Sequence, residues 1–116
     1  GTNDAAALIA IFNSLSSEDK EKIAQNKIRE MVFEITDGGS SDPNAARSAV
    51  DRLDQTKVIA RAFQIGNVSE SEKDTFNSVW NNGRAEKYGE IVGENIANLL
   101  PALVATLKKY LGDVRL

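Results

Sequence analysis

The sequence predicts an all-α fold, built as a compact bundle of four to five helices. Two observations support this prediction. Apolar residues recur at spacings of three and four along most of the chain, which is the pattern of one buried helix face. Residues that typically start helices stand before several of these stretches, and no alternation of apolar and polar residues favours a β-strand.

The length of the chain fits a single helical domain, residues 1–116, with one core. Its composition, 41% hydrophobic and 27% charged, is that of a globular protein. Gly1 has the character of a tag remnant, and no initiator Met precedes it. The sequence therefore leaves open what lies ahead of Thr2, including the signal peptide of an exported protein, and it assigns no compartment.

Two helices are expected in the first third of the chain. The first spans the apolar stretch that ends before Ser16. The second is expected from Ser16 to about Thr36, because Ser16 and Asp19 resemble a capping box. Phe33 lies off the apolar stripe of this second helix, among polar residues. It is therefore a candidate contact for a partner, with cover by a neighbouring element of the chain as the alternative.

A third helix is expected over residues 43–64, after a glycine-rich loop. Asp42 and Pro43 favour a helix start, because Asp caps the first turn and Pro fits the first helical position. The apolar face of this helix changes sides at residues 54–57. Either the helix breaks there, or its second half is buried on nearly every side. A dimer surface is the functional alternative for the second apolar face.

A short fourth helix is expected after Ser69 and Glu72, which form another capping box. It carries Phe76, Val79 and Trp80 at helical spacing. The polar turn that follows, with its glycine, is expected to end this helix.

The last helix is expected from about Arg84 to Leu111 and forms the spine of the predicted bundle. Its apolar residues fall within one arc at about 100° per residue. Pro101 lies opposite this arc, where water can satisfy the carbonyl that Pro leaves free. We therefore expect one long, Pro-kinked C-terminal helix. The alternative is a break, with Asn98 capping a new helix.

A row of small residues lies beside this arc and comprises Ala85, Gly89, Gly93 and Ala97. Glycine inside a helix costs about 1 kcal/mol relative to Ala, so another contact should offset it. Close approach of another helix of the same chain is the first explanation. A shallow groove that receives a partner helix or a second copy of the protein is the alternative.

The residue types present exclude several kinds of chemistry. The absence of Cys and His excludes thiol nucleophiles, disulfides, imidazole-based triads and Cys/His zinc sites. No phosphate-binding loop or nucleophile-elbow motif is present. Glu30 and Glu34 could in principle carry acid–base chemistry, but Glu pairs at this spacing are common on solvated helices. We therefore expect no catalytic residue, no metal and no cofactor.

Charge and hydropathy exclude two classes of partner. The net charge of −3 and the scattered basic residues argue against nucleic acid. No apolar stretch has the length of a transmembrane segment. Glu86, Glu90 and Glu94 form an acidic row on the last predicted helix. We interpret this row as a solvated face, with a site for a cation or a basic partner as the alternative.

The function expected from these observations is that of a non-enzymatic helical protein-interaction domain, such as an adaptor, an inhibitor, an immunity-type protein or a module of a larger assembly. Its partner is another protein or a second copy of the chain. The alternative is a small-ligand-binding bundle or small enzyme, with a cavity beside Gly89 and Gly93. The candidate interaction surface comprises Phe33, Ile59, Phe63, Gly89, Gly93 and Ala97.

Trp80 is the only tryptophan and should be mostly buried against the third or fifth predicted helix. We expect its fluorescence to be blue-shifted in the native state and to move to longer wavelength on unfolding. A native spectrum that matches indole in water would contradict this placement.

Overall fold

Three parallel β-strands form the centre of the molecule, so the prediction of an all-α helical bundle is wrong. The computed structural model describes residues 3–112. Helices and strands alternate along these residues as in α/β proteins. In chain order the elements are α1 (Asp4–Ser14), α2 (Ser17–Ala24), β1 (Met31–Thr36), α3 (Pro43–Gln55), β2 (Ile59–Ile65), α4 (Glu70–Trp80), β3 (Gly89–Gly93), the 3-10 helix η1 (Ile96–Asn98) and α5 (Leu99–Leu111).

The strands lie in the order β1-β2-β3, with β2 in the middle. Met31 is opposite Ile59 in the first pair of strands, and Ala62 is opposite Gly89 in the second. The register between β2 and β3 becomes irregular after Gln64. Because parallel strands need crossover connections, α3 joins β1 to β2 and α4 joins β2 to β3.

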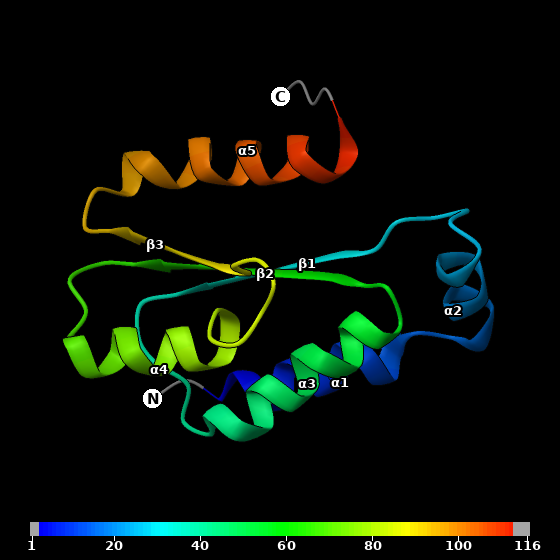
Figure 1. The fold of residues 1–116 in the computed structure, drawn as a ribbon, viewed down its shortest axis with the longest axis horizontal. Helices are drawn as coiled ribbons and strands as arrows, with labels where there is room; N and C mark the ends of the chain where they lie inside the picture. Colours follow the sequence, from blue (N-terminus) through cyan, green and yellow to red (C-terminus); the bar gives the residue numbers. More distant parts are fainter. Residues whose placement is uncertain (1–2, 113–116) are drawn as a thin grey trace.

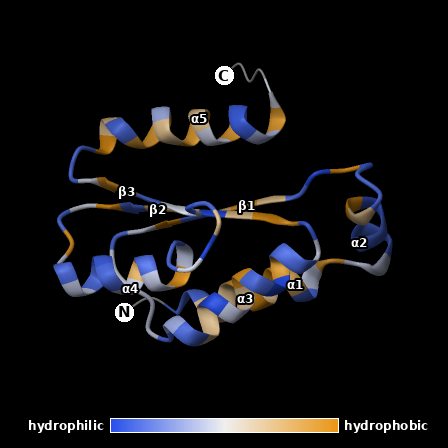
Figure 2. Cartoon of the chain, in the orientation of Figure 1, coloured by the Kyte–Doolittle hydropathy of each residue, from blue (hydrophilic) through white to orange (hydrophobic). Residues whose placement is uncertain are grey.

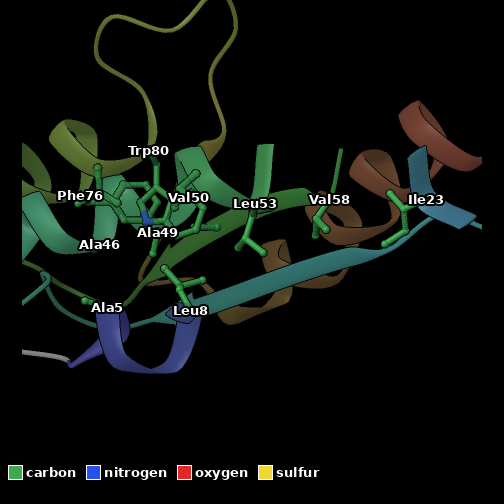
Figure 3. Packing of buried hydrophobic residues seen from close by; sticks show 13 residues of the cluster. Ala5, Leu8, Ile23, Ala46, Ala49, Val50, Leu53, Val58, Phe76 and Trp80 are labelled. Carbon is green, nitrogen blue, oxygen red and sulfur yellow. The ribbon is translucent and has the colours of Figure 1, made fainter. Parts of the chain in front are cut away.

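Helices cover the two faces of the sheet unequally (Figure 1). Helices α1, α3 and α4 lie on one face, called the lower face below, and α5 lies on the opposite, upper face. The hydrophobic core fills the space between the lower helices and the sheet, as Figure 3 shows for Leu8, Leu53 and Trp80. Apolar residues also run along the strands and along α5 (Figure 2).

Strand β1 occupies the end of the second predicted helix. That helix ends at Ala24 as α2, and the chain turns at Asn26, whose φ is 59°. The segment Met31–Thr36 is rich in β-branched and aromatic residues, which favour a strand. The spacing of three and four that suggested one helix therefore runs across two different elements.

Strand β2 occupies the second half of the third predicted helix. Helix α3 ends at Gln55, and Lys57 adopts a φ of 64°. The change of apolar face at residues 54–57 therefore marks a break, which was one of the two alternatives. Every residue from Ala60 to Gln64 is buried. A parallel strand covered on both faces has a nearly continuous apolar sequence, and this pattern is easily taken for a buried helix.

The predicted long, Pro-kinked C-terminal helix is also wrong. The segment 84–111 contains a turn, β3, η1 and α5. The chain breaks before α5 and Asn98 directly precedes this helix, as the alternative predicted, but the Asn98 side chain makes no capping hydrogen bond. Pro101 is the third residue of α5, where its missing N–H removes no helical hydrogen bond. The glycine row and the acidic row therefore do not lie on one helix face.

The helix starts predicted at Ser16, Asp42 and Ser69 are confirmed. The Ser16 hydroxyl accepts a hydrogen bond from the Asp19 N–H, and the Asp42 carboxylate accepts one from the Ala45 N–H. Ser69 and Glu72 form the reciprocal capping box at the start of α4. Trp80 is 1% exposed, as expected from its place in the sequence.

Gly89 lets β3 lie directly against α4. A Cβ built on Gly89 would be 2.5 Å from Cε1 of Phe76 and 2.8 Å from Cβ of Trp80. The close approach expected of the glycine row thus occurs at Gly89. However, Gly89 lies on a strand, β3, and not on a helix as predicted. Gly93 differs, because its φ is +88° and a Cβ there would meet nothing within 4 Å. Gly93 is instead needed for this positive φ, which residues with a Cβ rarely adopt.

We expect Gly89→Ala to lower the free energy of unfolding by about 1–3 kcal/mol, because the added methyl overpacks the contact with Phe76. Chemical denaturation measures this change, and light scattering should show an unchanged molar mass. The cost should be smaller in the background of Phe76→Leu, which removes the ring atoms that the methyl meets. Stabilisation by Gly89→Ala would contradict the close approach.

Candidate functional site

Three of the six candidate surface residues share the upper face of the sheet. Phe33 lies on β1, and Ile59 and Phe63 lie on β2. The rings of Phe33 and Phe63 pack with centroids 6.1 Å apart. Gly89 instead backs onto the lower helices, and Gly93 and Ala97 lie in the segment that leads to α5. The structure therefore gathers the aromatic candidates and separates them from the small ones.

Helix α5 leaves much of the upper side apolar and exposed. Its sequence is apolar on nearly every side, and yet none of its residues is buried. Leu100 is 60% exposed, and Ile96 in η1 is 59% exposed. A shallow hollow of about 450 Å³ lies along the outer side of the helix and is lined by Leu100, Pro101, Val104, Ala105 and Lys108. A helix that is apolar all round normally lies inside a protein or an interface.

Arg61 attaches the C-terminal end of α5 to the sheet. Its side chain projects from β2 and is buried, with the guanidinium carbon 3.8 Å from the ring centre of Tyr88 and 4.7 Å from that of Tyr110. Its Nε donates a 3.0 Å hydrogen bond to the Tyr110 hydroxyl, and its Nη2 lies 3.0 Å from a carboxylate oxygen of Glu86. A planar guanidinium can stack and donate in this way, whereas an ammonium cannot.

Glu86 joins the Arg61 side chain to α5. It accepts hydrogen bonds of 2.8 Å from Lys109 and 2.8 Å from the Tyr110 hydroxyl. These two hydrogen bonds, with the Lys109 contact the stronger cause, hold the pKa of Glu86 below its usual value. Glu86, Glu90 and Glu94 are all exposed, as the interpretation of the acidic row as solvated surface predicted, and Glu86 in addition forms these contacts.

A polar pocket of about 460 Å³ lies beside this network, at the start of β3. Its volume falls in the range of small-molecule sites. Glu86 forms ion pairs with two nearby cations, Arg61 and Lys109. The residues that line it are Arg61, Ala62, Phe63, Asn77, Asn81, Lys87, Tyr88, Gly89, Glu90, Ile91, Thr106, Lys109 and Tyr110.

A pair of carboxyl groups lies on the lower face. Asp4 is buried, and its Oδ1 accepts a 2.6 Å hydrogen bond from the Ser40 hydroxyl. Burial, followed by the charge of Asp4 and a hydrogen bond with it, raises the pKa of Glu34 to about 8, although a hydrogen bond with Trp80 opposes the shift. Glu34 is therefore largely protonated at neutral pH. Sequence reasoning had paired Glu34 with Glu30, and no local pattern links it to Asp4.

Within residues 3–112, no group of three or more acidic side chains has the arrangement of a metal site. None of the helices described for these residues is long and apolar enough to cross a membrane. The strongest surface features are therefore the apolar upper side and the polar pocket.

Comparison with known proteins shows a similarity to a longer protein. The chain is 33% identical over 114 residues to an uncharacterized protein of Treponema pallidum (strain Nichols). The match covers 98% of this chain and 19% of that protein, so the chain spans about a fifth of the length of its relative. No family model matches the chain, and no solved structure matches it either.

The raised pKa of Glu34 predicts a pH-dependent stability. The folded state holds a proton that the unfolded state releases above pH 4.5, so stability should fall as the pH rises from about 4.5 to about 8. The side chain in the Glu34→Gln variant cannot ionise, so this variant should not lose stability in this way as the pH rises. Its free energy of unfolding, relative to the wild type, should therefore rise by roughly 1–3 kcal/mol between pH 5 and pH 9.

Chemical denaturation at several pH values measures this difference. Glu90→Gln is the matched control, because it removes one exposed carboxyl from β3 and leaves the buried pair in place. Equal pH profiles for the two variants would contradict the protonation of Glu34.

Proposed function

We propose that this chain is a non-enzymatic protein-interaction domain that works as a module of a larger protein. One observation carries the proposal. Helix α5 is apolar on nearly every side, but no residue of it is buried. Exposed apolar surface of this extent is typical of interaction sites. The partner surface is therefore expected to be apolar and to lie against the outer side of α5.

The comparison with the Treponema pallidum protein supports the same proposal. The chain aligns over nearly its whole length, but with only 19% of that relative. A domain of this size inside a longer polypeptide has neighbouring regions that are available as partners. Interfaces between domains of one chain typically bury several hundred square ångströms or more, so the hollow along α5 is a natural part of such a contact.

The test replaces the matched region of the Treponema pallidum protein by this chain, with a protease site at each junction. After cleavage, the chain should stay with the flanking regions in size-exclusion chromatography. Leu100→Lys should weaken this association by about tenfold or more, because it places a charge in the apolar hollow. Ser48→Lys, at an exposed position of α3 on the lower side, is the matched control. Release of the unsubstituted chain after cleavage would contradict the proposal.

Binding of a small polar molecule is the second candidate function, because the pocket at the start of β3 includes Gly89 and has a suitable volume. It is the weaker candidate, because two of its cations, Arg61 and Lys109, are already paired with Glu86. Screening of small fragments by NMR tests it. Shifts confined to the amides of Lys87, Tyr88 and Gly89 would favour this function over the first.

A further inference from the structure

The outer edge of β1 is open. The strand pairs with β2 along one edge, and no strand within residues 3–112 pairs with its other edge. The Glu30 carbonyl accepts a hydrogen bond from the Ile59 N–H. Because backbone groups alternate along a parallel strand, Val32, Glu34 and Thr36 also face β2. The N–H and C=O groups of Met31, Phe33 and Ile35 therefore point away from the sheet.

The two edges of the sheet differ in how they are protected. Strand β3 is short, begins and ends with glycine, and is irregular near its end. The N–H of Gly89, which points outward, donates a 2.8 Å hydrogen bond to the side-chain oxygen of Asn81. Natural edge strands commonly carry such features, because they prevent pairing with other chains. The sequence of β1 (MVFEIT) has six residues without Gly, Pro or Lys, so it lacks these protections.

The upper face of β1 is also only partly covered. Ile35 is 48% exposed, although it lies on a parallel sheet whose strands are normally covered on both faces. Helix α5 makes few close contacts with β1. The open edge and the partly exposed face thus occur on the same strand.

We propose that a further β-strand, from a region of the longer polypeptide outside residues 1–116, pairs in parallel with the outer edge of β1, and that a helix from that region covers its upper face. The inference rests on the proposed function and names the partner. Its basis is the length of the relative, of which this chain spans 19%, together with the parallel direction of all three strands.

A second copy of the chain fits this edge less well. Two copies of β1 related by a two-fold axis perpendicular to the sheet would pair in the antiparallel direction. Ile35 would then stay exposed on the same upper side in both copies, because a two-fold axis perpendicular to the sheet brings no helix over this face. A strand with its own helix satisfies both the edge and the face.

Hydrogen exchange tests whether a further strand pairs with the outer edge of β1. In the isolated chain, the amides of Met31, Phe33 and Ile35 should exchange about 100-fold faster than those of Val32, Glu34 and Thr36. In the intact Treponema pallidum protein, all amides of the strand that aligns with Met31–Thr36 should be protected. Persistent fast exchange of alternate amides in the intact protein would overturn the proposal.

Proline substitutions test the edge itself. In the cleavable fusion described above, Phe33→Pro should reduce the association at least about tenfold, because it removes an N–H that the new strand needs. Phe33→Val is the control for loss of the ring, and Ile91→Pro removes an outward N–H from the opposite edge. Both controls should retain the association. If Phe33→Pro fails to fold while Phe33→Val folds, the Phe33 N–H is bonded within the chain, and the proposal fails.

These outcomes separate the two proposals. If the chain stays with the flanking regions but Phe33→Pro has no effect, the interaction domain stands and the strand pairing is wrong. If the isolated chain doubles its mass in light scattering and Phe33→Pro abolishes this, the occupant is a second copy and the proposal is overturned.

Discussion

Burial of β2 on both faces is the constraint on which the other layers depend. This strand carries two polar side chains, Arg61 and Gln64, that are 7% and 0% exposed. Buried polar groups need partners, so each recruits a neighbouring element. Arg61 bonds to Tyr110 of α5 and to Glu86 on the upper side. On the lower side, the Gln64 amide donates to the carbonyls of Gly38 and Glu72 and so ties the loop after β1 to α4.

The two faces of the sheet are consequently held together by different forces. Below, large apolar side chains of three helices interlock with the sheet, and hydrophobic burial dominates. Above, α5 is attached at its C-terminal end through the side chains around Arg61, while its apolar residues stay partly or largely exposed. This layer is held mainly by polar contacts, and much of its apolar surface is not covered. That imbalance is the physical reason for expecting a protein partner on this side.

Sequence reasoning succeeded where the signal is local and failed where it is not. The caps at Ser16, Asp42 and Ser69 were predictable, because each involves residues three positions apart. The strands were missed because buried parallel strands lack the alternation that marks a half-exposed strand. The break at residues 54–57 was the one signal that could have revealed β2. Arg61 meets Tyr110 across 49 positions, and no periodicity in a single sequence reports such a contact.

Strand β1 has the chemistry of an interior strand in the position of an edge strand. Its ionisable residue, Glu34, has a pKa raised to about 8 by partial burial and by the charge of Asp4, and is therefore mostly neutral at physiological pH. Its other side chains are apolar or, as with Thr36, buried. In a three-stranded sheet, only the middle strand can be paired on both edges. A fourth strand beside β1 would give β1 the surroundings that β2 already has, and its sequence is suited to those surroundings.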